Sequence, residues 1–340
     1  MTPDDAARTL KPFVDSLVVG EPLVHGGLTL VPLSGPAPHA DYLLAEDAFA
    51  AGLLNITETS PAGAVPELLA RNAAEVMVLL LDGEELVGAK QNRILNTSVL
   101  LPPKSATKIP VSCVEQGRWR PMSDRFSSGG FSPSRLRAMK SRAVKMNLEM
   151  SGEARSDQGE VWDEVQRCMS AAGAASPTMA MHDAIEQRKE SLEDYARALP
   201  WPEGSRGMVA AIGGKLAALD MFDKPETLRR MWPRLVGGYA LDALTRGARE
   251  GGEFTGKGAR ELLEHLAGLA CQSCPTVGVG EDWRFDSVAV VGQALVLQPA
   301  CVHLSAFPND SAPDAGQGRP IQSPSRRRRN LGRNSGQGTA

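Results

Sequence analysis

Two polar clusters hold the side chains best suited to chemistry, and the first lies in residues 84–93. This stretch places carboxylates, amides and two cations within ten residues: Glu84, Glu85, Lys90, Gln91, Asn92 and Arg93. A lysine offers a point charge to a phosphate, an arginine offers a bidentate fork, and an amide can orient a ribose or a base edge. Neighbouring side chains on a strand face opposite ways, so only one of the two glutamates can point at a shared site. We expect Lys90, Asn92 and Arg93 to bind a ligand, with Glu85 as a candidate general base.

The second polar cluster directly follows an apolar stretch, residues 106–114, that is typical of a strand. Its members are Glu115, Gln116, Arg118 and Trp119. A carboxylate, a cation and an aromatic ring at a strand end can serve as base, phosphate clamp and stacking surface. We expect Glu115 to be the leading candidate for a general base, because a carboxylate that faces cations stays ionised at neutral pH. Gln116 is expected to orient the ligand and Arg118 to bind its phosphate.

The two clusters are expected to form one cleft. They flank the strands of a single predicted antiparallel meander, in which neighbouring strands lie about 4.8 Å apart, so their ends can meet. The cleft would then bind a phosphate-containing ligand. A structural alternative stays open for each cluster: Glu85 and Lys90 can form an ordinary cross-strand ion pair, and Arg118 can pair at the surface while Trp119 fills the core.

Four further residues raise the question of a zinc site, namely Cys271, Cys274, Cys301 and His303. Only one Cys-x-x-Cys pair is present, whereas strong zinc signatures contain two, so buried thiols are the favoured interpretation and no metal is expected. The sequence contains neither a dinucleotide fingerprint nor a phosphate-binding P-loop, and it identifies no cofactor.

The composition is that of a protein with a hydrophobic core. Of the 340 residues, 42% are apolar, yet no run of 18 apolar residues exists that could cross a membrane. Five cysteines, an odd number, do not form a disulfide framework. The first residues lack the basic-then-apolar layout of a signal peptide. We expect a cytoplasmic protein that has no membrane partner.

Charge is distributed unevenly along the chain. The net charge is −3, yet residues 87–145 carry twelve basic and only two acidic residues. Residues 308–340 add an excess of four positive charges, so the remainder of the chain is strongly acidic. A positive segment within an acidic protein favours a locally bound anion over a general nucleic-acid surface. The alternative is that the segment folds against acidic neighbours and forms surface ion pairs.

The predicted elements follow no regular alternation of strand and helix. Strands cluster toward both ends of the chain and helices occupy its middle, which predicts an α+β fold with antiparallel sheet. Two-residue turns at 82–83, 213–214 and 292–293 predict hairpins, and Pro233 is expected to kink or break a long helix. Residues 127–130 are expected to form a loop. Residues 1–307 are expected to form a single domain, followed by a disordered tail over residues 308–340.

Several longer motifs resemble one known family. Residues 81–96 read LDGEELVGAKQNRILN, and residues 109–119 read IPVSCVEQGRW. The similarity continues through DQGEVWDE at 157–164, MWPRL at 231–235 and GVGEDWR at 278–284, and it ends with VHLSAF at 302–307. Over about residues 22–307, the chain resembles the domain of unknown function named for its association with ADP-ribosylglycohydrolases and rhodanese-phosphatases. The resemblance implies a place beside enzymes of NAD-derived ADP-ribose metabolism, and it implies no catalytic residues.

Three functions are compatible with these features. The first, which we favour, is the binding or processing of a phosphate-bearing nucleotide ligand related to ADP-ribose. The second is a nucleic-acid-binding or RNA-processing module, which is disfavoured because few aromatic residues lie inside the basic segment. The third is a non-catalytic scaffold for partners of the ADP-ribosylglycohydrolase or phosphatase type. The sequence leaves open whether the chain is an enzyme.

Overall fold

Antiparallel strands and a central group of helices build the fold, which confirms the predicted α+β class. The computed structural model describes residues 8–60, 63, 66–247 and 253–309. These residues contain 19 strands and 8 helices, and the chain up to Asn309 forms one compact unit. No helix in these ranges is long and apolar enough to cross a membrane. The predicted tail lies outside the described residues, apart from Pro308 and Asn309.

The largest sheet has ten strands and is antiparallel throughout. Nine of its strands follow one another in the order β1 (Arg8–Thr9), β16 (Ala270–Cys274), β17 (Glu281–Asp286), β18 (Val290–Leu297), β19 (Ala300–Pro308), β15 (Lys215–Phe222), β14 (Ser205–Ile212), β4 (Leu28–Ser34) and β2 (Val18–Val19). The tenth strand, β3 (Leu23–His25), pairs with β4. Strands from near both ends of the chain therefore share one sheet.

Two smaller sheets carry the residues predicted to form the site. The six-stranded sheet has the order β13 (Phe126–Phe131), β9 (Glu84–Gly88), β10 (Arg93–Leu95), β12 (Ser105–Cys113), β7 (Glu67–Asn72) and β6 (Leu54–Glu58). The three-stranded sheet has the order β11 (Val99–Leu101), β8 (Met77–Leu80) and β5 (Tyr42–Leu44), and its β5–β8 pair is parallel. The short helix α2 (Ala45–Ala50) follows β5 and packs beside it.

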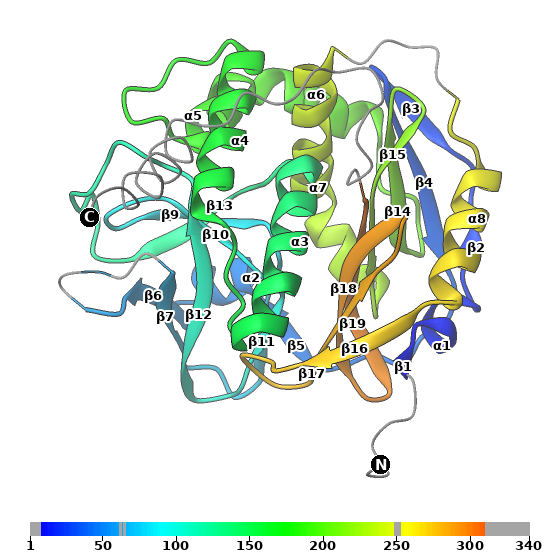
Figure 1. Cartoon of the computed structure of the whole chain (residues 1–340), viewed down its shortest axis with the longest axis horizontal. Coiled ribbons are helices and arrows are strands. Elements are labelled where there is room, and N and C mark those ends of the chain that lie inside the picture. The colour runs from blue at the N-terminus through cyan, green and yellow to red at the C-terminus, as the bar shows by residue number, and fades with distance from the viewer. Residues whose placement is uncertain (1–7, 61–62, 64–65, 248–252, 310–340) are drawn as a thin grey trace, which may run out of the picture. The chain divides into compact units, whose positions relative to one another are not determined.

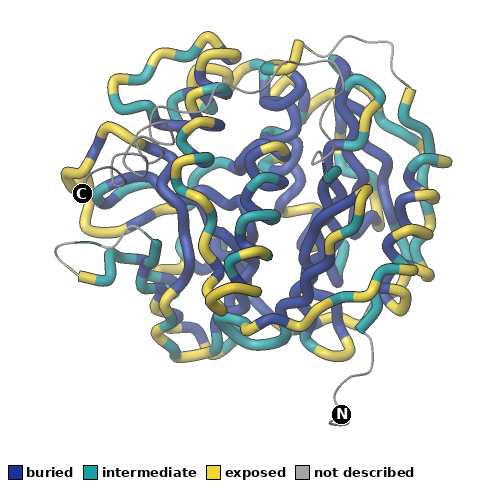
Figure 2. Tube along the Cα trace, in the orientation of Figure 1, coloured by how far each residue is buried: buried dark blue, intermediate teal, exposed yellow. Residues whose placement is uncertain are grey.

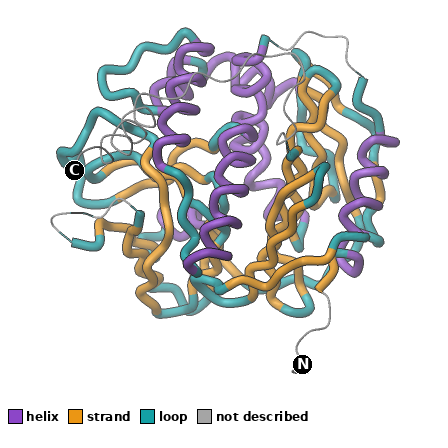
Figure 3. The backbone as a smooth tube through the Cα atoms, in the orientation of Figure 1, coloured by secondary structure: helices purple, strands orange, loops and turns teal. Residues whose placement is uncertain are grey.

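Five helices lie between the large sheet and the six-stranded sheet (Figures 1 and 3). They are α3 (Ser134–Ser151), α4 (Gln158–Ala172), α5 (Met181–Gln187), α6 (Lys189–Ala198) and α7 (Pro225–Arg246). The other face of the large sheet is covered by α1 (Lys11–Val14) and α8 (Gly256–Ala267). Alternation along β14 divides its side chains between two cores: Met208 and Ala210 face the central helices, and Val209 faces α1 and α8. The central strands of this sheet, such as β14 and β19, are accordingly drawn as buried along almost their whole length in Figure 2.

A buried ion network joins α3 to the sheets. Lys140 and Arg137 on α3 contact Asp82 at 2.9 and 3.3 Å, and Arg137 also contacts Asp220 of β15 at 2.7 Å. All four side chains are at most 2% exposed. Because burial of a charge is costly unless it is paired, this network commits two of the basic residues in the positive segment to the core.

Several local predictions meet different outcomes. The hairpin at 213–214 is confirmed, because β14 and β15 pair across it. The hairpin at 82–83 is wrong, since β8 and β9 belong to different sheets. Residues 292–293 lie inside β18, paired on both sides, so that turn is also wrong. Residues 127–130 belong to strand β13, which pairs with β9, and are not a loop. Pro233 was expected to kink or break a long helix, and the break is wrong, because α7 runs through Pro233 from Pro225 to Arg246.

Candidate functional site

A buried ion pair fastens the chain between β9 and β10. Glu115 and Arg118, which follow β12, lie 2.6 Å apart between Oε2 and Nη2, and both are buried. The Glu115 carboxylate also accepts the backbone N–H of Asn92 at 3.0 Å and the hydroxyl of Thr178 at 2.8 Å. Three predicted site residues, Asn92, Glu115 and Arg118, are therefore brought together. We call these three residues and Thr178 the clamp.

The charged groups of the clamp form their hydrogen bonds with other atoms of the protein. All three guanidinium nitrogens of Arg118 donate to protein acceptors, namely the side chains of Glu115 and Asn92 and the carbonyl oxygens of Gly88, Ala89 and Arg120. Burial alone would raise the pKa of the Glu115 carboxyl, but the hydrogen bonds from Arg118, Asn92 and Thr178 outweigh it and hold that pKa below its usual range. A carboxylate that already accepts four hydrogen bonds is a weak base at neutral pH. This geometry positions residues 88–92.

Arg93 lies beyond the clamp, in a second group, and it is fully buried. Its Nη1 donates to Gln91 Oε1 at 2.9 Å and to Cys113 Sγ at 2.7 Å. Its Nη2 lies 3.9 Å from Oε1 of Glu58, at the end of β6, which is too long for a hydrogen bond. Among the described residues, Nε and Nη2 of Arg93 and both carboxylate oxygens of Glu58 are buried without a hydrogen-bond partner. Such atoms are rare in native proteins, and here four of them gather at one place.

An open cleft lies next to this group. Its volume is about 410 Å³, and its polar lining includes Glu58, Ser60, Arg71, Lys90 and Ser123. The ring of Trp119 lies close by, 48% exposed, with its centroid 5.3 Å from Lys90 Nζ and 5.8 Å from Arg93 Cζ. Two predicted ligand-binding residues, Lys90 and Arg93, therefore lie close to the same aromatic ring. We call this hollow the Lys90 cleft.

Glu85 lies apart from the Lys90 cleft. Arg93 pairs with Leu86 across the strands, and residues that pair directly share a face, so the neighbouring Glu85 points to the other side of the sheet. There its Oε2 accepts the backbone N–H of Gly130 at 3.1 Å and lies 2.9 Å from Nδ1 of His182. The hydrogen bond to Glu85 raises the pKa of His182. The structure therefore does not bring the two carboxylates expected as general bases, Glu85 and Glu115, to one site.

Two contacts of the site had no signal in the local sequence. Glu58 comes from β6, far before the polar clusters, and His182 comes from α5, far after them. Neither has a spacing that links it to Lys90 or Glu85: the order of strands in the sheet brings Glu58 close, and the packing of α5 against β13 brings His182 close. Gln116, by contrast, carried a signal but is exposed and does not line the Lys90 cleft.

Two groups of nucleophilic side chains are buried too deeply to meet a substrate. Ser98 Oγ lies 2.7 Å from Nδ1 of His303, whose Nε2 lies 3.1 Å from Asp220, but all three residues are at most 4% exposed. Burial raises the pKa of the Cys113 thiol to about 11, although Arg93 acts in the opposite direction, so the thiol stays protonated at neutral pH. In the described ranges, no three His, Cys, Asp or Glu side chains are grouped to hold a metal ion.

Comparison with known proteins places the chain in a family. The ARG and Rhodanese-Phosphatase-superfamily-associated Protein domain matches residues 16–307, which include the clamp and the Lys90 cleft. No curated protein matches the chain, and no solved structure matches it either. The match confirms the resemblance carried by residues 81–96 and 109–119, and it spans most of the sequence. The chain belongs to the ARG and Rhodanese-Phosphatase-superfamily-associated Protein domain family.

Proposed function

We propose that this domain binds a phosphate-bearing nucleotide ligand related to ADP-ribose in the Lys90 cleft. The observation that carries the proposal is the group of four buried polar atoms on Arg93 and Glu58 that have no hydrogen-bond partner among the described residues. Glu58 lines the cleft, and a ligand hydroxyl can donate to its carboxylate once the side chain turns toward the opening, because neither carboxylate oxygen accepts a hydrogen bond from the described residues. A ribose presents such hydroxyl groups. The family's name, which refers to ADP-ribosylglycohydrolases, supports the same ligand class.

The rest of the cleft suits the other parts of a nucleotide. Lys90 and Arg71 supply positive charge for a phosphate, and Ser60 and Ser123 supply hydroxyl groups for its oxygens. The half-exposed ring of Trp119 offers a surface on which a base can stack. A phosphate, a ribose and a base can therefore be recognised by neighbouring groups.

The clamp has a supporting role in this proposal. Asn92, Glu115 and Arg118 hold the segment that carries Lys90, and they keep their hydrogen bonds within the protein. Lys90, Glu58 and Trp119 are the residues proposed to meet the ligand, whereas Arg93 is fully buried and does not line the cleft. Glu85 and His182 form a separate pair on the opposite face of the sheet and are not assigned to this ligand.

Substitution of Lys90 tests the proposal directly. We predict that Lys90→Gln weakens ADP-ribose binding about tenfold or more in isothermal titration of the full chain, because a charged hydrogen bond to phosphate is lost. The matched control is Lys108→Gln, which removes the same charge from an exposed surface ion pair with Glu67 and should leave the affinity unchanged. Both lysines are partly or fully exposed, so both variants should melt near the wild-type temperature.

The outcomes separate the proposal from its alternatives. Equal affinities for the two variants and the wild type would place the ligand elsewhere and overturn the assignment of the cleft. A second variant, Glu58→Gln, keeps the size of the side chain and removes its charge, so it should also weaken binding if a ribose hydroxyl donates to this carboxylate. Normal binding by Glu58→Gln would contradict the proposed contact between the ligand and the Glu58 carboxylate.

A further inference from the structure

One buried arginine differs from the others in its partners. Five arginines in the described part of the chain are buried: Arg93, Arg118, Arg137, Arg206 and Arg284. Four of them have a carboxylate oxygen within 4.0 Å. Arg206, on β14, is 2% exposed and has none among the described residues. A buried charge without a counter-charge is costly, so its persistence calls for a reason.

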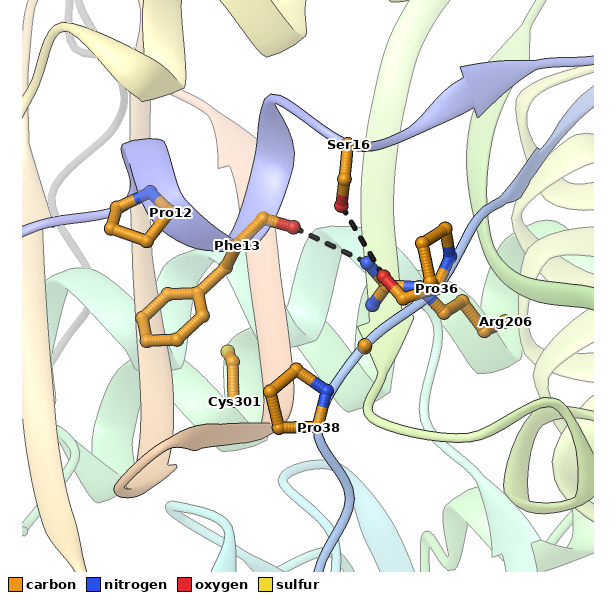
Figure 4. A pocket seen from close by; sticks show the side chains of 8 residues that line it. Pro12, Phe13, Ser16, Pro36, Pro38, Arg206 and Cys301 are labelled. Carbon is orange, nitrogen blue, oxygen red and sulfur yellow. Dashed lines mark hydrogen bonds between the residues drawn. The ribbon is translucent and has the colours of Figure 1, made fainter.

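The contacts of Arg206 are all with backbone carbonyl oxygens. Its Nε donates to Gly35 at 3.0 Å, its Nη1 to Phe222 at 2.9 Å and its Nη2 to Phe13 at 3.3 Å. Figure 4 draws a smaller pocket that Arg206 also lines, and it shows the side chain beside Pro36, with the Phe13 carbonyl on one side. These oxygens carry only partial charge, and a guanidinium has five N–H groups, so neither its charge nor its donors are fully matched.

Arg206 lines a pocket together with a second basic side chain, Lys224. The pocket has a volume of about 380 Å³ and is also lined by His39 and Lys224. Lys224 Nζ donates to the carbonyl of Ala40 at 3.0 Å and lies 3.8 Å from the centroid of the Tyr42 ring, and no carboxylate among the described residues lies within ion-pair distance of it. Two cations of one pocket are thus paired with carbonyls or a ring, while most buried cations of this protein are paired with carboxylates.

The start of α7 adds to the attraction for an anion. This helix has 22 residues and begins at Pro225, next to the pocket, and no side chain caps its N-terminus. The free N–H groups and the dipole of a helix N-terminus favour negative charge. Two carboxylates also line the pocket. Asp223 is buried and occupied by the Tyr42 hydroxyl and the Ala40 N–H, whereas Glu226 is exposed.

We propose that this pocket, which we call the Arg206 pocket, binds a phosphate group, either as inorganic phosphate or as a phosphomonoester. Arg206 and Lys224 supply the charge, and the first turn of α7 supplies backbone donors. The Arg206 pocket shares no lining residue with the Lys90 cleft, so it is a separate anion site. The volume of the pocket exceeds the size of a phosphate ion, which leaves room for a small organic group attached to it.

Two substitutions of opposite sign test the site without disturbing buried Arg206. Binding of inorganic phosphate and of glycerol 3-phosphate is measured by the rise in melting temperature of the full chain at constant ionic strength, and then by titration. Lys224→Gln should weaken binding about tenfold or more, because one charged contact is lost. Glu226→Gln should strengthen it, because an exposed negative charge is removed from the pocket rim. Lys215→Gln, which removes an exposed lysine elsewhere, should leave it unchanged.

The two phosphate probes also separate the possible sources of the anion. Tighter binding of glycerol 3-phosphate than of inorganic phosphate indicates a phosphomonoester ligand, and the reverse indicates the free ion. The proposal is overturned if neither probe raises the melting temperature, or if Lys224→Gln and Glu226→Gln change the affinity in the same direction. Lys90→Gln should leave phosphate binding at the Arg206 pocket intact, so failure of this site and failure of the Lys90 cleft can be told apart.

Discussion

At the scale of single residues, much of the second polar cluster has a structural role. Glu115 and Arg118 were expected to face a ligand, but their hydrogen bonds end on Asn92, Thr178 and backbone carbonyls. A buried ion pair adds little to the free energy of unfolding compared with a well-packed apolar pair. Removing only one partner is strongly destabilising, because the other charge is then buried alone. The clamp should therefore be seen first in stability measurements.

We predict that Glu115→Gln lowers the free energy of unfolding by about 3 kcal/mol, because it leaves the buried Arg118 charge uncompensated. The pKa of Glu115 is depressed in the folded protein, so its contribution is fully present above the unfolded pKa of about 4.3 and is lost as the pH falls through the folded pKa. Urea unfolding at pH 7 and at lower pH should accordingly show the variant and the wild type converging in acid.

The matched control for this prediction is Glu75→Gln, which breaks a surface ion pair with Lys104 that is exposed on both sides. It should change the unfolding free energy by no more than about 1 kcal/mol. Equal losses for the two variants, or a difference that does not shrink toward acid pH, would show that the clamp is not held by the Glu115 charge.

The sequence allowed part of the site to be predicted, for a physical reason. Asn92 directly precedes β10, and Glu115 and Arg118 follow β12, its antiparallel neighbour, so their convergence could be expected from strand ends alone. Glu58 could not be found in this way, because it reaches Arg93 only through the order of β6, β7, β12 and β10 in the sheet. Whether an arginine such as Arg118 is available to a ligand depends on whether backbone carbonyl oxygens already accept its hydrogen bonds. No sequence pattern predicts which carbonyl oxygens do so.

At the scale of elements, turns were predicted well only where the chain reverses within one sheet. Residues 213–214 join two strands that pair with each other, as a two-glycine turn predicts. Residues 82–83 have the same kind of signal, but there Asp82 is buried against Arg137 and Lys140, and the chain passes from one sheet to another. Asp82 and Gly83 are residue types that favour a tight turn. Contacts with distant parts of the chain nevertheless determine which sheet the following strand, β9, joins.

Two adjacent glycines of α7 offer a sharp test of the packing. A Cβ added at Gly237 meets nothing within 4 Å, whereas one at Gly238 would lie 3.0 Å from the carbonyl oxygen of Ser132 and 3.2 Å from that of Phe131. We predict that Gly237→Ala raises the unfolding free energy by about 0.5–1 kcal/mol, since alanine is the better helix former. Gly238→Ala should lower it, because α7 must move away from the chain that follows β13.

Thermal unfolding of the two single variants measures both effects, and each variant is the control for the other. Helix propensity is the same at both positions, so any difference between them reports the contact with Ser132 and Phe131. Stabilisation of similar size by both substitutions would mean that α7 does not approach this segment as closely as described.

At the scale of the whole molecule, the excess of positive charge in residues 87–145 is largely matched by carboxylates from other parts of the fold. Arg137 contacts Asp82 and Asp220 in the core, and Arg135 contacts Glu164 on α4. The sequence allowed the excess to be counted, but not its partners, which lie far away along the chain. Lys90 lines a cleft, and a local ligand is therefore proposed in place of a broad basic surface.

The central claim is that the Lys90 cleft binds an ADP-ribose-like nucleotide, and ligand-dependent melting of the full chain tests it most directly. ADP-ribose at about 100 times its dissociation constant should stabilise the protein by about 2.7 kcal/mol, and a short RNA should not. Lys90→Gln should lose this stabilisation at the same ligand concentration. The account is contradicted if ADP-ribose leaves the melting temperature unchanged while RNA raises it with a steep dependence on salt, since that result describes a nucleic-acid-binding protein.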